Sequence, residues 1–378
     1  MSRLWTIIMI AALVLAGCAS DEPDVPAQPA RRTILVYMIA TNSLGGNQRD
    51  LQDLQEMDQA VTAGALDGCR LLVYRVSPGG DAPALFEIKL NNRKEVVHET
   101  LLTYAATEGA SVTPERMRQV IGDMKAEAPA QEYGLVLWSH GTGWARSLTT
   151  KAASPTLKDF GEDNGATMSL TQLAQGIPTG LFEWIYADAC YMACVEVAYE
   201  LRNHCHYFVG YTTEIPSQGM PYDLTLPLLC KEKAQLKEAC RATYDYYNAQ
   251  SGQSRTFAAA VVDCSHMDEL AQVCRTIQQQ GTPLESTQSL QCYNLNSYRF
   301  FFDFLQYYQY ICPDNMQAEL LDIYNKVLID KMATPAIFNR FLIDPAHFSG
   351  LSTYIRGTSP GVNEQYYENL AWAQALWE

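Results

Sequence analysis

Two short polar segments carry the residue types needed for nucleophilic catalysis. His140 follows one apolar run, Tyr133–Trp138, and Cys190 follows another, Phe182–Ala187. A thiol attacks a carbonyl carbon once it loses its proton, and a nearby imidazole can take up or supply protons in that reaction. Because the carboxyl ends of neighbouring parallel strands meet at one edge of a sheet, we expect His140 and Cys190 to lie together there.

The residues next to this pair also suit thiol chemistry. Gly141 has no Cβ, so backbone N–H groups beside it can approach the oxyanion of an acyl transfer. The apolar spacing predicts a helix over Met192–Leu201 that Cys190 opens, and a helix N-terminus favours a thiolate. A serine hydrolase is the competing class, because Ser139–Gly141 faintly resembles the oxyanion loop of lipases. Neither segment contains the G-x-S-x-G pentapeptide that such enzymes usually carry.

Apolar runs alternate with helical segments along the first two thirds of the chain. The runs expected to be strands are Thr33–Ala40, Gly68–Ser77, Leu85–Leu90, Glu95–Glu99, Tyr133–Trp138, Phe182–Ala187, Tyr207–Tyr211 and Phe257–Val262. A loop is expected at Thr41–Asn47, a helix at Gln48–Val61 and a helix start at Thr113–Pro114. Strands interleaved with helices predict a mostly parallel sheet covered on both faces. After residue 265 the pattern becomes helical and aromatic, with a late strand expected at Gly350–Ile355.

The sequence resembles the clostripain family of cysteine peptidases, which are relatives of caspases, gingipains and legumains. The resemblance is carried by WSHGTGW at Trp138–Trp144 and DACYM at Asp188–Met192. Weaker matches lie at the early strand from Thr33, at Phe302–Phe304 and at Gly350–Tyr354. The resemblance implies that His140 is the catalytic histidine, Cys190 the nucleophile and Gly141 part of the oxyanion site.

The fold that this resemblance implies is an α/β, caspase-like three-layer α/β/α sandwich with a mostly parallel central sheet. We expect a peptidase domain over residues 33–265 and a mainly helical C-terminal extension over residues 266–378 that packs on the core. Protein or peptide substrates are the expected partners, and no cofactor or metal is expected. The alternative is a catalytically silent, lipid-anchored binding protein on the same fold, because the presence of His140 and Cys190 in a sequence does not show that the protein turns over a substrate.

Family members characteristically cleave after Arg or Lys, using acids in the pocket for the P1 side chain. One acid lies two residues before the nucleophile, which is Asp188 in this sequence. The second lies in the loop after the next strand, and our placement puts Gln218 there, which departs from the pattern. Glu214 or Asp223 is the candidate substitute. The preference for a basic P1 residue is therefore weaker than in relatives with two acids.

The first residues of the chain resemble a bacterial lipoprotein leader. An apolar run over Leu4–Ala16 ends in Leu-Ala-Gly-Cys, so residues 1–17 are interpreted as a signal peptide and Cys18 as the lipidated mature N-terminus. Residues 18–32, rich in proline and acids, are expected to be a disordered tether. These features predict a lipoprotein of the cell envelope, in the outer membrane of a Gram-negative bacterium. The acidic segment Ser20–Glu22 resembles a surface-export tag, so display of the protein on the cell surface stays open.

Relatives are often activated by a cut between the histidine and cysteine motifs. The segment 146–167 is polar and without periodicity, so we expect an exposed loop that offers Arg146, Lys151 and Lys158 as basic cleavage sites, with Lys151 or Lys158 favoured. The ten cysteines after Cys18 show no disulfide framework spacing. The cluster at His204–His206 lacks a second ligand pair, so zinc is not expected there.

Composition excludes several classes of protein. Hydrophobic residues make up 48% of the 378-residue chain and charged residues 18%, so a sizeable core can form and global disorder is excluded. The formal net charge of -15 disfavours a nucleic acid partner, because cations supply most of the affinity for phosphates. A monomer is expected.

Overall fold

The computed structural model describes residues 29–145, 160–294, 299–358 and 363–377. Its centre is a nine-stranded sheet with the order β12-β10-β9-β8-β5-β1-β2-β3-β4. The five strands from β9 to β2 run parallel, and the pairs at both edges are antiparallel. The strands are β1 (Ala30–Ile39), β2 (Cys69–Val76), β3 (Ala84–Leu90), β4 (Val96–Thr103), β5 (Ala130–Trp138), β8 (Phe182–Asp188), β9 (Cys205–Tyr211), β10 (Ala258–Asp263) and β12 (Leu328–Ala333).

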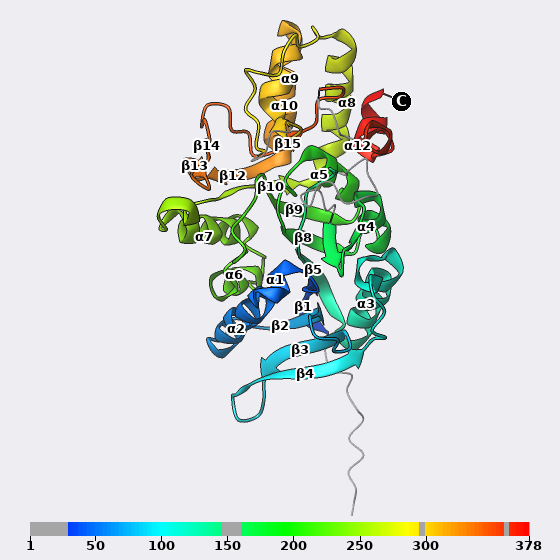
Figure 1. Ribbon diagram of the computed structural model, residues 1–378, viewed down its shortest axis with the longest axis vertical. Coiled ribbons are helices and arrows are strands. Elements are labelled where there is room, and N and C mark those ends of the chain that lie inside the picture. The colour runs from blue at the N-terminus through cyan, green and yellow to red at the C-terminus, as the bar shows by residue number, and fades with distance from the viewer. Residues whose placement is uncertain (1–28, 146–159, 295–298, 359–362, 378) are drawn as a thin grey trace, which may run out of the picture.

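Helices cover both faces of this sheet, which confirms the predicted three-layer sandwich (Figure 1). One face carries α2 (Arg49–Thr62), α6 (Tyr222–Leu229) and α7 (Leu236–Asn248). The other carries α3 (Pro114–Glu127), α4 (Leu170–Gly176), α5 (Val195–Leu201) and α8 (Met267–Gln280). Alternate residues of β1 enter the two cores: Leu35 and Tyr37 face one, Val36 and Met38 the other. This is why the run is apolar throughout, since both of its faces are buried.

The chain after residue 265 is largely helical and lies at one end of the sheet (Figure 1). It contains α9 (Phe304–Ile311), α10 (Gln317–Val327), α11 (Glu364–Glu368) and α12 (Ala371–Trp377). It also supplies β12, which pairs antiparallel with β10, so this part of the chain extends the central sheet as well as covering it. Two-residue strand pairs complete it: β11 (Phe302–Asp303) with β15 (Ser352–Thr353), and β13 (Ala336–Ile337) with β14 (Phe341–Leu342).

Several local predictions are confirmed and others differ. Thr113 caps α3, where its hydroxyl accepts from the Arg116 N–H at 3.3 Å, and β3 and β4 form the expected hairpin. The expected loop at 41–47 instead contains a one-turn helix, α1 (Ser43–Gly46). The first strand begins at Ala30, earlier than expected, and the late strand is only Ser352–Thr353. Between the catalytic segments lies a small hairpin, β6 (Phe160–Asp163) with β7 (Ala166–Met168).

Candidate active site

The register of two parallel strands brings the histidine and cysteine segments together. β5 and β8 are neighbours, and Trp138 is the partner of Asp188. His140 and Cys190 each lie two residues after that pair, so the two segments leave the sheet at the same edge. Both residues line a cavity of about 370 Å³ at this edge, a volume suited to a side chain and its flanking peptide.

Cys190 sits in a tight turn rather than at the start of a helix. The next residue, Tyr191, has a φ of 59°, a left-handed conformation that residues with a side chain rarely adopt. The ring of Tyr191 stacks on Phe301 with centroids 4.7 Å apart, and its N–H donates to the Thr213 carbonyl at 3.1 Å. The predicted helix starts only at Val195, so the inference that its dipole activates Cys190 is wrong.

The surroundings of Cys190 favour its protonated thiol. Its S–H donates to the Ile215 carbonyl oxygen at 3.9 Å. Burial raises the pKa of Cys190 to about 12, and the charges of Glu214 and Asp188 add to the rise. A thiol with a raised pKa needs a base to become a nucleophile.

The imidazole of His140 is held by a residue that sequence reasoning missed. The Ser43 hydroxyl lies 2.8 Å from Nε2 of His140. Ser43 is the first residue of α1, and this helix is capped by Asn42, whose side chain accepts from the Leu44 N–H at 2.9 Å. The Asn42 cap is the sequence signal that would have revealed this turn of helix.

Gly141 allows the two catalytic segments to approach closely. A Cβ at Gly141 would lie 3.0 Å from both the Cβ of Ala189 and the carbonyl oxygen of Cys190. Contacts that short require the neighbouring backbone to shift. The absence of a side chain therefore lets the backbone after His140 pass directly beside the turn at Cys190.

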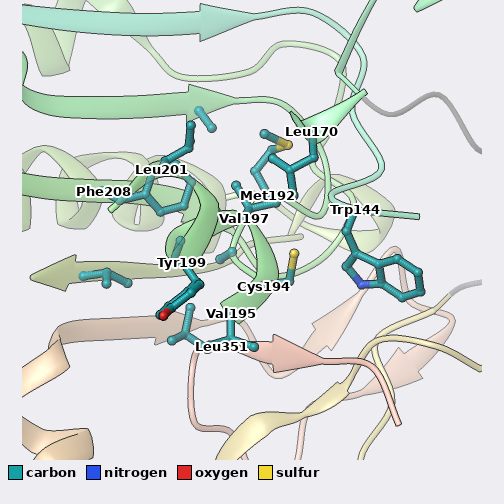
Figure 2. Close-up of a cluster of buried hydrophobic side chains, with 14 of the residues drawn as sticks. Trp144, Leu170, Met192, Cys194, Val195, Val197, Tyr199, Leu201, Phe208 and Leu351 are labelled. Carbon is teal, nitrogen blue, oxygen red and sulfur yellow. The ribbon is translucent and has the colours of Figure 1, made fainter. Parts of the chain in front are cut away.

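Aromatic packing from the C-terminal part of the chain supports both segments. The ring of Trp144 lies 4.8 Å from that of Tyr354 and 4.9 Å from that of Tyr367. Figure 2 shows Trp144 and Cys194 in the same buried cluster, near the start of α5. The Ser352 N–H donates to the Ala193 carbonyl at 3.1 Å, which ties β15 to that loop.

Asp188 forms the floor of the cavity. Its carboxylate accepts from the Tyr211 hydroxyl at 3.2 Å, the Tyr222 hydroxyl at 3.1 Å and the Met220 N–H at 3.1 Å. Burial raises the pKa of Asp188 to about 6, and these hydrogen bonds limit the rise. A Cβ at Gly219 would lie 2.8 Å from one carboxylate oxygen, so a glycine there keeps the space in front of Asp188 open.

The other predicted pocket residues are placed differently from one another. Glu214 lines the cavity and accepts from the Tyr191 hydroxyl at 3.3 Å; burial raises its pKa. Gln218 is exposed and is not among the residues that line the cavity, although its neighbours Ser217 and Gly219 are. Asp223 lies in the first turn of α6, outside the cavity lining.

Some predicted sites lie outside the described residues. These are Cys18, with the signal peptide and most of the tether, and the cleavage candidates Arg146, Lys151 and Lys158. Over the described ranges, no group of three or more His, Cys, Asp or Glu side chains is arranged to hold a metal ion. Within those same ranges, no helix has the length and apolar character needed to cross a bilayer.

The three-layer fold, with a thiol and an imidazole at one cavity, is that of a cysteine peptidase. The model of the clostripain family, peptidase C11, matches residues 36–334. This chain belongs to the clostripain family. No curated protein sequence matches it.

Solved structures of the same family superpose on most of the chain. A secreted C11 cysteine protease from Bacteroides thetaiotaomicron, "iotapain", is 26% identical with a TM-score of 0.79, and covers 92% of this chain and 99% of its own. An inactive zymogen C11 protease from Parabacteroides distasonis is 29% identical with a TM-score of 0.79, and covers 93% and 99%. A Bacteroides thetaiotaomicron clostripain in complex with the peptide inhibitor BTN-VLTK-AOMK is 28% identical with a TM-score of 0.51, and covers 57% and 97%.

Proposed function

We propose that this cysteine peptidase is an endopeptidase that works through a dyad of Cys190 and His140 and cleaves after Arg or Lys. The observation that carries the dyad is the placement of both side chains in one cavity, two residues beyond a register pair of adjacent strands. No cofactor is required for this chemistry.

In this mechanism the sulfur of Cys190 attacks the scissile carbonyl carbon as its proton passes to the imidazole of His140. The electron pair of the carbonyl moves to the oxygen, and that oxyanion lies against the backbone N–H groups at Gly141. Collapse of the tetrahedral intermediate expels the amine, which takes the proton from His140. Water then attacks the thioester with His140 as base, releasing the acid and restoring the thiol.

The preference for basic residues rests on the charges of the cavity. Asp188 at its floor and Glu214 at its wall are both carboxyl groups, and no Lys or Arg is among the described residues of its lining. A cationic side chain hydrogen-bonded to one such carboxylate gains about 1.5–3 kcal/mol. The peptide of the inhibitor bound to the Bacteroides thetaiotaomicron clostripain ends in Lys, which supports the same preference here.

A thiol probe with Lys at P1 tests the dyad and the preference together. We expect it to label Cys190 in the wild type and to leave Cys292 unlabelled, although Cys292 is the other half-buried cysteine in the described part of the chain. Cys190→Ala should lose all turnover and keep its fold, because one sulfur atom contributes little packing. Turnover retained by Cys190→Ala would overturn the dyad, and a peptide library without Arg or Lys selection would overturn the pocket assignment.

Two further proposals concern placement and maturation. We place the enzyme in the cell envelope, anchored by a lipid on Cys18; Cys18→Ser should release it from membranes, and unchanged fractionation would contradict this. We also propose that the chain cuts itself after Lys151 or Lys158, in keeping with the relative described as an inactive zymogen. Wild type and Cys190→Ala are incubated and their fragment masses compared; a wild type that stays intact would contradict self-processing.

A further inference from the structure

Two cysteines that the peptidase mechanism does not use lie against each other at the far edge of the sheet. Cys69 is the first residue of β2, whose other end points to the catalytic edge, and Cys230 follows directly after α6. Both side chains are buried, and the Cys69 sulfur lies 3.5 Å from the Cys230 carbonyl oxygen. The pair therefore connects the start of a central strand to the end of a helix that packs on it.

Two arginines of β1 surround this pair with positive charge. Arg31 Nη2 lies 3.7 Å from the Cys69 sulfur and donates to the Cys230 carbonyl at 2.5 Å. Arg32 Nη1 donates to the carbonyls of Leu229 at 3.0 Å and Lys231 at 2.8 Å. The guanidinium groups thus bind the C-terminal end of α6, where a cation suits the helix dipole, and they stabilise a thiolate at Cys69.

The electrostatics of Cys69 differ from those of the other buried cysteines. The pKa of Cys69 is lowered to about 6, first by a hydrogen bond from the Cys230 thiol and further by the charges of Arg32 and Arg31, against the effect of burial. Burial raises the pKa of Cys240 to about 12 and that of Cys274 well above its ordinary value. The surroundings of Cys69 thus favour its thiolate, whereas burial favours the protonated thiols of Cys240 and Cys274.

A second thiol pair in the chain provides a natural comparison. The sulfur atoms of Cys205 and Cys264 lie 3.9 Å apart and both residues are buried. Burial and the neighbouring Cys264 thiol raise the pKa of Cys205 well above its ordinary value. This second pair is therefore a buried pair of thiols in which the pKa is shifted in the opposite direction from that of Cys69.

A small cavity lies beside Cys230. A cavity of about 200 Å³ is lined by Cys230, Lys231 and Pro227 on one side and by residues 63–65 and Asp67 on the other. Cys230 thus borders this cavity, and Cys69 contacts Cys230.

We propose that Cys69 and Cys230 form a reactive dithiol that closes to a disulfide on contact with a disulfide oxidant, either a small molecule or a protein. The Cys69 thiolate attacks one sulfur of the oxidant, forms a mixed disulfide and expels a thiolate. Cys230 then loses its proton and attacks the Cys69 sulfur, which expels the second thiolate. Two electrons and two protons pass from the dithiol to the oxidant, which leaves as two thiols.

The disulfide would fix the end of α6 to the sheet. α6 begins at Tyr222, whose hydroxyl donates to Asp188 and whose N–H donates to Glu56 at 2.9 Å. The crosslink would thus hold the helix whose first residue, Tyr222, binds Asp188, and Asp188 lines the catalytic cavity. This consequence for the cavity rests on the proposed function, whereas the thiol chemistry does not.

The test uses the full chain as Cys190→Ala, which removes the active-site thiol and prevents self-cleavage. The reduced protein is exposed to oxidised glutathione at pH 7, free thiols are alkylated, and the peptides are identified by mass spectrometry. We expect Cys69 joined to Cys230, with Cys205 and Cys264 alkylated. Alkylation of both Cys69 and Cys230, or glutathione remaining on Cys69 beside a free Cys230, would overturn the proposal.

Three variants test the effect of charge and the identity of the reacting pair. Arg31→Gln keeps both thiols and should slow disulfide formation several-fold at pH 7, with the loss reduced at pH 9; an unchanged rate would refute activation by charge. Oxidation should raise the Tm of the Cys190→Ala protein and leave that of Cys190→Ala/Cys69→Ser unchanged, whereas Cys190→Ala/Cys205→Ser should still respond. An equal Tm for oxidised and reduced protein would contradict the stabilisation of α6. None of these readouts depends on peptidase activity, so their failure leaves the proposed function standing.

Discussion

The Ser43 hydroxyl lies 2.8 Å from Nε2 of His140, although 97 residues separate them in the chain. The contact engages Nε2 of the ring, and a hydrogen bond at one nitrogen orients an imidazole and selects its tautomer. Ser43 is thus a positioning residue, and its capped turn of helix presents it to the catalytic edge of the sheet.

Ser43→Ala should lower kcat by up to about tenfold with little change in KM, because a neutral hydrogen bond contributes about 0.5–1.5 kcal/mol. The pH profile of kcat should also shift, which a purely structural role would not cause. Ser217→Ala is the matched control, since Ser217 lines the same cavity and is exposed. Steady-state kinetics of both variants measure this difference. An unchanged kcat in Ser43→Ala would contradict a positioning role for Ser43.

Asp188 predicts a pH dependence for basic substrates. Its pKa is raised to about 6, so the carboxyl group is ionised above that pH and becomes neutral as the pH falls through it. The kcat/KM for a P1 Lys substrate should therefore fall below about pH 6, more steeply than for a P1 Ala substrate. Asp188→Asn should lose the preference for Lys by about tenfold to a hundredfold and abolish the difference between the two profiles. Parallel profiles in the wild type would show that Asp188 does not contact the P1 side chain.

The position of Gly219 allows a steric test of the pocket around Asp188. Its φ of 64° and the 2.8 Å approach of a Cβ to the Asp188 carboxylate mean that Gly219→Ala is strained and narrows the cavity floor. We expect KM for P1 Arg and Lys substrates to rise markedly, with a smaller effect on substrates with a small P1 residue. Gly180→Ala is the control, since Gly180 also has a positive φ but open space around its Cβ. Equal losses in both variants would assign the effect to backbone strain alone.

Glu196 predicts that stability falls as the pH rises. This carboxyl group of α5 is fully buried and accepts from the Tyr354 N–H at 2.8 Å and the Thr353 hydroxyl at 3.1 Å. Burial raises the pKa of Glu196 to about 7, above the value of 4.5 in the unfolded chain. As the pH rises, Glu196 therefore ionises first in the unfolded state, and this lowers the free energy of the unfolded state relative to the folded state. The cost grows from about pH 4.5 and is complete above about pH 7, at about 3 kcal/mol.

Glu196→Gln should remove this pH-dependent cost. The free energy of unfolding of the variant should then change less between pH 5 and 8 than that of the parent protein. Denaturant unfolding of both proteins in the Cys190→Ala background, where no self-cleavage occurs, measures the difference. The same slope in both proteins would mean that Glu196 is ionised in the fold at every pH tested.

Much of the fold could be predicted from local patterns. Features that depend on neighbours in the chain are present as predicted. They are the doubly buried strand β1, the cap and proline at Thr113–Pro114, and the hairpin of β3 and β4. The start of α5 was predicted wrongly, because apolar spacing continues through the turn after Cys190 and does not mark where the helix begins. The one-turn helix at Ser43 was missed for the opposite reason, since four residues are too few for any periodicity.

By itself, the sequence determined that a histidine and a cysteine end two buried strands, and that an acid stands two residues before the cysteine. Only the tertiary structure decided which other residues join them: Ser43 at the imidazole, Gly219 in front of Asp188, and Gln218 exposed outside the cavity. The same holds for Cys69 and Cys230, which the sheet edge and the end of α6 bring together. Strand order and loop course set these contacts, and they depend on packing between distant segments, which local residue patterns do not record.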